Sequence, residues 1–292
     1  MSRREEVAPG VIVFRSSVYS MASGLVLPRP GKARAGAPAL LVDPGVLPSE
    51  VMAISEELQR AGARAALLLL THSDWDHVSG ASQFPGARVI CSSAYPARVS
   101  ASRREIEEEI ESFATAFPSR PRPRVVIPEA GTLVGSESLI LDSPRTARAV
   151  PSPGHTSDGL ALLLPDEGVL FAGDYLCALE IPFVESSFPE FRRTLARFRR
   201  LLMEGAVHKV VPGHGPWLDA ATARDVLEQD DRYLASVETA VGKILELGGT
   251  GEEALGAAAG VAVHRGAQDA DIVRGHRRNC ALAVRELAAG GV

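Results

Sequence analysis

Two histidines and two aspartates lie within the seven-residue stretch THSDWDH, residues 71 to 77. The stretch directly follows the apolar run AALLLL, which is typical of a buried strand. A turn or a helix cap needs only one such polar residue, whereas imidazole nitrogens and carboxylate oxygens together are common ligands of a divalent metal ion. Because the chain has only seven histidines, two of them in one loop raise the question of whether the loop is a helix cap or a metal site.

Other histidines and an aspartate follow apolar runs in the same way, in PSPGHT, VLFAGD and VPGHG. Side chains at the ends of several strands can meet at one edge of a sheet, where loops carry functional residues. One histidine at such a place is usually structural, but four histidines and three aspartates in this pattern predict a metal centre. The predicted ligands are His72, Asp74, Asp76, His77, His155, Asp174 and His214.

The elements that must position the first group are predicted strands and helices in alternation. The runs GVIVFRSS, SGLVLPRP and ALLVDPG are typical of strands, and residues 49 to 61 have helical spacing with Ser49 as the predicted N-cap. This helix leads into the strand ARAALLLL, so a βαβ-like unit ends at THSDWDH.

After ARVICSSA, a second helix is predicted over SRREIEEEIESFATAFP, with one apolar stripe that consists of Ile106, Ile110, Phe113 and Phe117. The following PSRPRPR predicts a stiff exposed loop, with a mobile lid as the alternative.

The second half of the chain is also predicted to consist of short strands and amphipathic helices. Strands are predicted in TLVGSESLIL, TARAVPSPG, LALLLP, GVLFAGD and HKVVPGHG, and a helix over FPEFRRTLARFRRLL. For the arginines of this helix (Arg192, Arg193, Arg197, Arg199 and Arg200) we prefer solvation over phosphate binding. The sequence from Thr222 on is helical, and its stripe predicts packing on the core, as part of the substrate pocket or as a homodimer contact. The stripe consists of Val226, Tyr233, Val237, Val241 and Ile244.

Composition excludes some classes of protein and leaves others open. With 292 residues and 46% hydrophobic residues, the chain can build a large core, and its net charge of −5 argues against binding to nucleic acid or anionic lipid through bulk charge. The N-terminal MSRREEVAPGVIVF contains no long apolar stretch, so we expect neither a secretory signal nor a membrane span, and a cytoplasmic location. Cys91, Cys177 and Cys280 are predicted to be buried thiols in a reducing compartment.

The seven-residue set resembles the metallo-β-lactamase superfamily, whose pattern is HxHxDH followed by a histidine, an aspartate and a histidine. The resemblance covers roughly residues 10 to 218. It implies an α/β fold, a four-layer αββα sandwich, with two divalent ions between the sheets: usually zinc, sometimes iron or manganese. We therefore expect a catalytic core at residues 1–218 and a C-terminal helical extension packed on it at residues 219–292.

The resemblance also implies a role for each ligand. His72 and His155 match the first metal site, and Asp174 matches the carboxylate that bridges the two ions. The second site corresponds to Asp76, His77 and His214. Asp43, in LVDPG, matches a position close to the site.

Asp74 departs from the commonest pattern, which has a second histidine there, although HxExDH and HxDxDH branches of the superfamily exist. Carboxylate oxygen is an acceptable zinc ligand, so the first site should still fill. The extra carboxylate lowers the positive charge of the site by one and offers a harder ligand, which makes manganese or iron more plausible beside zinc. We predict that Asp74 binds the first ion from an extended loop rather than capping a helix.

The implied activity is that of a dinuclear metal-dependent hydrolase, in which a bridging hydroxide attacks a small-molecule ester, thioester, lactone or related bond. Asp174 and Asp76 are the predicted catalytic residues; Asp76 would also take a proton as the intermediate collapses. The alternatives are a phosphodiesterase or nuclease, an iron-dependent sulfur dioxygenase, and a metal-bound binding protein without turnover. The acidic charge and the lack of a clustered Lys/Arg stripe beyond the one arginine-bearing helix count against a nuclease.

Four further residues are weaker candidates. Tyr175 either donates a hydrogen bond to substrate or is packed in the core, and Trp75 is predicted to wedge the ligand loop against the core. His276 and Asn279 could face the site from the C-terminal helices, but we favour an exposed helical surface for both. The substrate itself depends on residues 95–125 and 219–292, where the family pattern gives no guidance.

Overall fold

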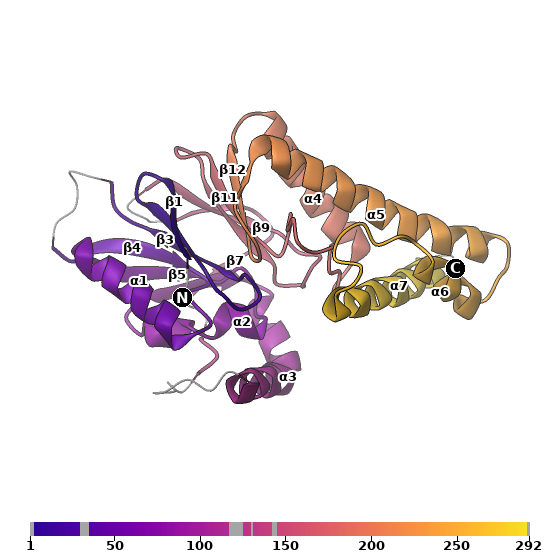
Figure 1. The fold of residues 1–292 in the computed structure, drawn as a ribbon, viewed down its shortest axis with the longest axis horizontal. Coiled ribbons are helices and arrows are strands. Elements are labelled where there is room, and N and C mark those ends of the chain that lie inside the picture. Colours follow the sequence, from indigo (N-terminus) through magenta and orange to yellow (C-terminus); the bar gives the residue numbers. More distant parts are fainter. Residues whose placement is uncertain (1–2, 30–34, 117–124, 130, 142–144, 291–292) are drawn as a thin grey trace.

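The computed structural model describes residues 3–29, 35–116, 125–129, 131–141 and 145–290. Two sheets lie face to face, and helices cover both outer faces (Figure 1). This arrangement confirms the predicted α/β four-layer sandwich with helices at its C-terminal end. None of the helices within the described ranges is long and apolar enough to cross a membrane.

The first sheet contains seven strands in the order of the chain, β1 to β7. Its first four strands pair antiparallel, and β4 to β7 pair parallel. Parallel pairing requires crossover connections, which the helices α1 and α3 provide. The strands are β1 (Arg3–Ala8), β2 (Val11–Arg15), β3 (Ala22–Val26), β4 (Ala37–Val42), β5 (Ala63–Leu69), β6 (Arg88–Ser92) and β7 (Thr132–Val134). The helices of this half are α1 (Pro48–Arg60), α2 (Trp75–Val78) and α3 (Tyr95–Ala116), and a 3-10 turn spans Ala81–Gln83.

The second sheet has the order β13-β12-β11-β10-β9-β8. Among its described strands, only β11 and β12 pair parallel, and the helix α4 crosses between them. The strands are β8 (Leu139–Leu141), β9 (Ala147–Pro151), β10 (Leu160–Leu164), β11 (Val169–Gly173), β12 (Lys209–Pro212) and β13 (Leu218–Asp219). The helices are α4 (Phe188–Met203), α5 (Ala220–Glu246), α6 (Gly251–Ala259) and α7 (Ala270–Gly290).

Alternation along the strands creates the layers. On β10, Leu160, Leu162 and Leu164 point into the core between the two sheets, whereas Ala161 and Leu163 face the helices α4 to α7. Because successive side chains of a strand point to opposite faces, strands that are apolar on both faces must be covered on both sides. The apolar run of β10 is therefore covered on both faces, as the four-layer sandwich implied by the family resemblance requires.

Two predicted helix starts are wrong, by two residues for α1 and by seven for α3. The N-cap of α1 is Leu47 rather than Ser49, because Pro48 fits the first helical position and the carboxylate of Glu50 accepts hydrogen bonds from the backbone N–H groups of Val46 and Leu47. Helix α3 begins at Tyr95 instead of Ser102. Phe117 and the PSRPRPR loop, for which a lid was considered, lie outside the described residues.

The C-terminal helices pack on the second sheet. Val226, Tyr233, Val237 and Val241 of the α5 stripe are buried in the same core as α4, and Ile244 is partly buried against it. The last strand ends at Asp219 and α5 begins at Ala220. Cys91, Cys177 and Cys280 are free and buried, as expected.

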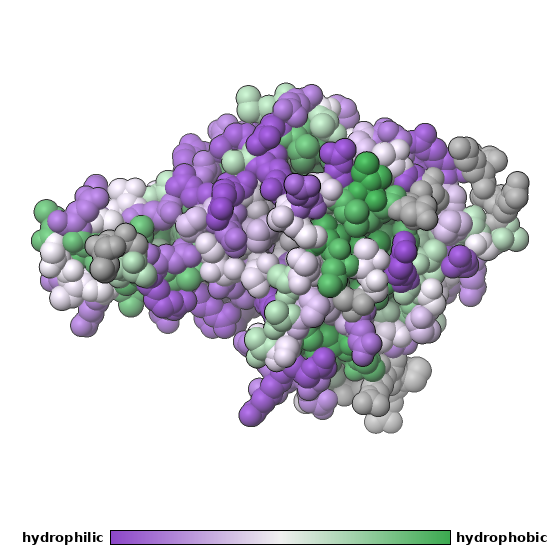
Figure 2. All heavy atoms as spheres, turned by 180° about the vertical axis from the view of Figure 1, so that it is seen from behind, coloured by the Kyte–Doolittle hydropathy of each residue, from purple (hydrophilic) through white to green (hydrophobic). Residues whose placement is uncertain are grey.

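The surface seen from behind is mostly hydrophilic but carries a hydrophobic patch (Figure 2). Exposed large hydrophobic side chains also occur on the edge strands β7 and β8, where Leu133, Leu139 and Ile140 are 49%, 38% and 67% exposed. Edge strands with apolar side chains are sites at which chains can associate. A homodimer nevertheless stays a prediction.

Candidate metal centre

All seven predicted ligands lie at one edge of the sandwich, just beyond the ends of strands. His72 follows β5, His155 follows β9, Asp174 follows β11 and His214 follows β12, while Asp76 and His77 lie in α2. The four histidines and Asp76 are buried. The strand-end pattern of the sequence thus brings residues from both sheets to one place.

The first cluster contains His72, Asp74 and His155. The Oδ2 atom of Asp74 lies 3.3 Å from the Nε2 atom of His72 and 3.3 Å from that of His155. Donor atoms about 2.1 Å from a tetrahedral zinc ion lie roughly 3.4 Å from one another. These three donor atoms are therefore spaced as the ligands of one ion would be.

The second cluster contains Asp76, His77 and His214. The Oδ2 atom of Asp76 lies 3.4 Å from the Nε2 atom of His214 and 3.9 Å from that of His77. Asp174 lies between the clusters: Oδ1 is 3.2 Å from His77 Nε2, and Oδ2 is 3.4 Å from His155 Nε2. One carboxylate thus faces the histidines of both clusters.

Each histidine is held through its Nδ1 atom, which leaves Nε2 to face the centre. His155 Nδ1 donates to the carbonyl of Phe183 at 2.7 Å, and His214 Nδ1 donates to the carbonyl of Tyr19 at 2.8 Å. A carbonyl can only accept, so these two rings carry a proton on Nδ1, and in the neutral imidazole the Nε2 lone pair is free for a metal ion.

Asp43 and Thr71 hold the other two rings. His77 Nδ1 donates to Asp43 Oδ2 at 2.9 Å, and Thr71 Oγ1 donates to the same oxygen at 2.6 Å. The Thr71 oxygen lies 3.0 Å from His72 Nδ1, from which it can accept a hydrogen bond. The expected place of Asp43 beside the site agrees with these contacts, and its partner Thr71 was not singled out from the sequence.

The centre contains possible ligand atoms without hydrogen-bond partners, and it contains several carboxylates. Both features are compatible with bound cations. Among the described residues, the Nε2 atoms of His72, His77 and His155 and Oδ1 of Asp174 are buried without a hydrogen-bond partner. Burial alone would lower the pKa of His155, but the nearby carboxylates of Asp74 and Asp174 raise it to about 10. Burial opposes ionisation of Asp174, yet the neighbouring histidines hold its pKa well below the usual value. Bound divalent ions would give these buried nitrogen and oxygen atoms a partner and would balance the charge of the carboxylates.

Asp74 occupies the N-cap position of α2, but its side chain makes no capping hydrogen bond. Its carboxylate instead points to His72 and His155. The prediction of an extended ligand loop is wrong for the second half of the motif, because Asp76 and His77 lie in a helical turn. The helical turn directs both of these consecutive side chains toward the same cluster, whereas an extended chain would point them to opposite sides.

Asp74→Asn should weaken metal binding at the first cluster by at least about tenfold, because a neutral amide is a poor replacement for a carboxylate ligand. Asp74→His should retain metal and shift the preference toward zinc. Metal content and hydrolytic rate, measured with zinc and manganese supplied separately, test both variants. Full occupancy and rate of Asp74→Asn with either metal would make Asp74 a structural turn residue.

The C-terminal helices reach the first cluster through one buried amide. Asn279 of α7 donates to the carbonyl of Pro182 at 2.7 Å and accepts from the N–H of Val184 at 2.9 Å, and the carbonyl of Phe183 between them holds His155. Asn279 and His276 are buried, so the expectation of an exposed helical surface is wrong. The reason is that α7 packs against α5 and the loop before α4, which the sequence of α7 alone does not reveal.

Asn279→Ala should lower the free energy of unfolding by about 1–3 kcal/mol, since it leaves buried backbone groups unpaired. It should also weaken metal binding, because the loop that holds His155 loses its anchor. Thermal unfolding and metal titration measure the two effects separately, with Arg277→Ala on the exposed side of α7 as the control. Loss of stability with unchanged metal affinity would limit Asn279 to a structural role.

Aromatic residues adjoin the centre but serve different purposes. Tyr175 is packed in the core: its hydroxyl accepts from the N–H of His155 at 3.0 Å and donates to the carbonyl of Pro153 at 2.8 Å. Trp75 packs on Phe113 of α3, with ring centroids 4.7 Å apart, and against the core behind the first sheet, as the wedge prediction expected. Of the two alternatives for Tyr175, the structure favours packing over a contact with substrate.

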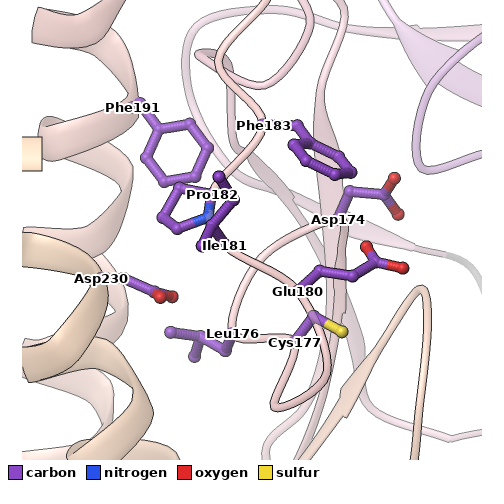
Figure 3. A pocket seen from close by; sticks show the side chains of 9 residues that line it. All are labelled: Asp174, Leu176, Cys177, Glu180, Ile181, Pro182, Phe183, Phe191 and Asp230. Carbon is purple, nitrogen blue, oxygen red and sulfur yellow. The ribbon is translucent and has the colours of Figure 1, made fainter. Parts of the chain in front are cut away.

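A small pocket lies beside the centre, between the loop after β11 and the helices α4 and α5. Figure 3 shows Asp174 and Glu180 on one side of it and Asp230 of α5 on the other. The apolar residues Leu176, Ile181 and Phe191 line the space between them. Asp230 of α5 therefore lines a pocket next to Asp174, and a role of the C-terminal helices in binding substrate stays a prediction.

Gly213 is a residue of the centre that the sequence did not single out, although it lies in VPGHG. A Cβ atom at this position would lie 2.1 Å from Asp174 Oδ1 and 3.0 Å from His77 Cε1. The backbone cannot easily retreat, since the N–H of Gly213 donates to the carbonyl of Gly173 and its own carbonyl accepts from the N–H of Ala22. Only glycine fits this close approach.

Comparison with known proteins agrees with this architecture. The model of the metallo-β-lactamase superfamily matches residues 33–234. The β-lactamase-like protein 2 homologue of Drosophila melanogaster is 26% identical over 187 residues, which cover 62% of this chain and 56% of that protein. The chain thus spans little more than half of the curated relatives that it matches.

Two solved structures share the fold along nearly the whole chain. A metallo-β-lactamase family protein from Thermus thermophilus has a TM-score of 0.64 at 22% identity and covers 98% of this chain and 95% of its own. A β-lactamase domain protein from Burkholderia ambifaria has a TM-score of 0.65 at 17% identity, with 98% and 88% covered. These identities show the fold alone, but the superfamily model covers more than half of the chain. The chain therefore belongs to the metallo-β-lactamase superfamily.

Proposed function

We propose that this chain is a metal-dependent hydrolase that binds two divalent ions and acts on a small-molecule ester, thioester, lactone or related bond. The observation that carries the proposal is the position of Asp174, whose two oxygens face the histidines of both ligand clusters. A carboxylate shared in this way is what a pair of adjacent ions requires. We put zinc first, with manganese or iron as alternatives because of Asp74.

Bound divalent ions supply Lewis acidity and bring the pKa of a water molecule close to neutrality. The residues of the chain supply the geometry. The Nδ1 contacts of the four histidines fix their ring orientations, Asp174 holds the clusters together, and the carboxylate of Asp76 is the group that we assign to proton transfer. Burial of the histidines limits the access of bulk water to the centre.

The charge around the centre favours a small neutral substrate over a nucleic acid. Glu109, Glu180 and Glu185 surround the site, and burial together with the charges of nearby aspartates raises their pKa values. Carboxyl groups at these positions provide none of the cationic contacts that phosphate backbones need. Two of the arginines of α4 are already paired with carboxylates: Arg192 pairs with Asp231 and Glu238, and Arg199 pairs with Asp231.

Elemental analysis and a substrate panel test the proposal. We expect close to two metal ions per chain after preparation with metal supplied, and turnover of at least one chromogenic ester, thioester or lactone that a chelator abolishes. A well-folded preparation that never exceeds one ion would overturn the dinuclear assignment. Turnover confined to phosphodiesters would favour the phosphodiesterase, oxygen consumption with a persulfide and iron would favour the dioxygenase, and no turnover at all would favour a binding protein.

A further inference from the structure

We propose that Arg98 of α3 is a positioning residue for the candidate metal centre, and that it belongs functionally to Asp74. It holds one oxygen of Asp74 so that only the other oxygen faces the histidines. Its positive charge also offsets the negative charge that an aspartate adds where the commonest pattern has a neutral imidazole. The inference rests on the proposed metal-binding role of Asp74.

The geometry divides the carboxylate of Asp74 between two partners. Arg98 Nη2 lies 2.5 Å from Asp74 Oδ1, and Arg98 Nη1 donates to Ser73 Oγ at 2.6 Å. The other oxygen, Oδ2, lies 3.3 Å from the Nε2 atoms of both His72 and His155. The guanidinium group is planar and presents its donors as a rigid fork, so contacts to two successive residues fix the orientation of the carboxylate. Asp74 is thereby held as a ligand through one oxygen.

The surroundings of Arg98 fix the guanidinium in turn. The Arg98 side chain is only 15% exposed, and Nε lies 3.7 Å from Oδ1 of Asp158, whose side chain is fully buried. Asp158 has no hydrogen bond within the described parts of the chain, so Arg98 is the cation that compensates it. Glu185 Oε2 lies 3.7 Å from Nη2. An arginine among three carboxylates in a partly buried place keeps its charge and its position.

The charge of Arg98 matters because this chain has Asp74 where the commonest pattern of the superfamily has a histidine. Replacing a neutral imidazole by a carboxylate adds one negative charge to the first cluster, and Arg98 adds one positive charge next to it. Taken alone, the pair of Asp74 and Arg98 has the net charge of the imidazole that it replaces, and the same guanidinium also lies beside the buried Asp158. The charges of Asp74 and Asp158 outweigh the burial of Arg98 and raise its pKa, which agrees with a tightly held ion pair.

The test is a double-mutant cycle between Arg98 and Asp74 with metal affinity as the readout. Arg98→Gln should weaken binding of the more weakly held ion by about 10–100-fold, the range seen for groups that orient ligands. In the Asp74→His background the same change should cost less than about threefold, because there is no carboxylate to hold. Zinc and manganese affinities are measured by competition with a chelating dye, so that the result does not depend on turnover.

Controls separate this effect from loss of the fold. Arg103→Gln, on the exposed side of α3 where Arg103 pairs with Glu107, should change nothing. Arg98→Lys keeps the charge beside Asp158 but cannot contact Ser73 and Asp74 together, so it should fold and lose severalfold in affinity. If Arg98→Gln does not fold, Arg98→Lys in the two backgrounds decides the question in the same way.

Equal losses in the Asp74 and the Asp74→His backgrounds would overturn the inference and leave Arg98 a structural partner of Asp158. Unchanged affinity of Arg98→Gln or Arg98→Lys in the parent chain would also overturn it. Failure of the proposed function looks different, because the parent chain itself would then bind no metal ions.

Discussion

Asp174→Ala should remove most of the bound metal and lower the hydrolytic rate by on the order of 10³-fold or more. The side chain faces His77 through Oδ1 and His155 and His214 through Oδ2, so its loss affects both clusters at once. Without a carboxylate between them, two bound ions would repel each other and bind less tightly. Loss of the ions would remove several kcal/mol of charge stabilisation from the transition state. Elemental analysis and the rate on the best substrate of the panel provide the measurement.

The matched control is Asp225→Ala, which removes an exposed carboxylate from α5. It should bind metal and turn over substrate as the parent chain does. If Asp174→Ala instead kept two ions and more than half of the parent rate, the shared position of Asp174 would have no functional meaning, and the dinuclear proposal would lose its main support.

Gly213→Ala should have an effect of similar size although it changes no ligand. The added Cβ would overlap Asp174 Oδ1 and press on His77, so the carboxylate must leave its place between the clusters. We expect loss of at least one of the two ions and a rate lower by at least about 10²-fold, since small displacements of catalytic groups are costly. Metal content, rate and thermal unfolding should be measured together.

Gly242→Ala tests whether the effect belongs to the site. Gly242 lies in α5, and a Cβ there would meet nothing within 4 Å. Alanine in a helix interior is more favourable than glycine by about 1 kcal/mol, so this variant should be slightly stabilised and fully active. A Gly213→Ala protein with parent metal content and parent rate would show that the Asp174 carboxylate tolerates displacement.

The sequence by itself determined the fold class and the set of candidate ligands. The apolar runs predicted the strands, and the resemblance of the ligand pattern to the metallo-β-lactamase superfamily implied the layered sandwich, in which strands such as β10 are covered on both faces. The chemistry of THSDWDH, together with His155, Asp174 and His214 at strand ends, predicted which side chains meet, because residues after successive strands of a sheet reach the same edge. These properties depend on residue type and short-range spacing, which a sequence displays directly.

Only the tertiary structure decided what holds those ligands in place. Arg98 lies beside Asp74, Asn279 anchors the loop that holds His155, and Gly213 leaves room for Asp174. Each of these contacts joins elements that are far apart in the chain, and periodicity shows which face of a helix is buried but not what lies against it. The partners of a ligand are therefore set by how α3, α7 and the two sheets pack together, because that packing fixes the distances between their side chains to within a few tenths of an ångström.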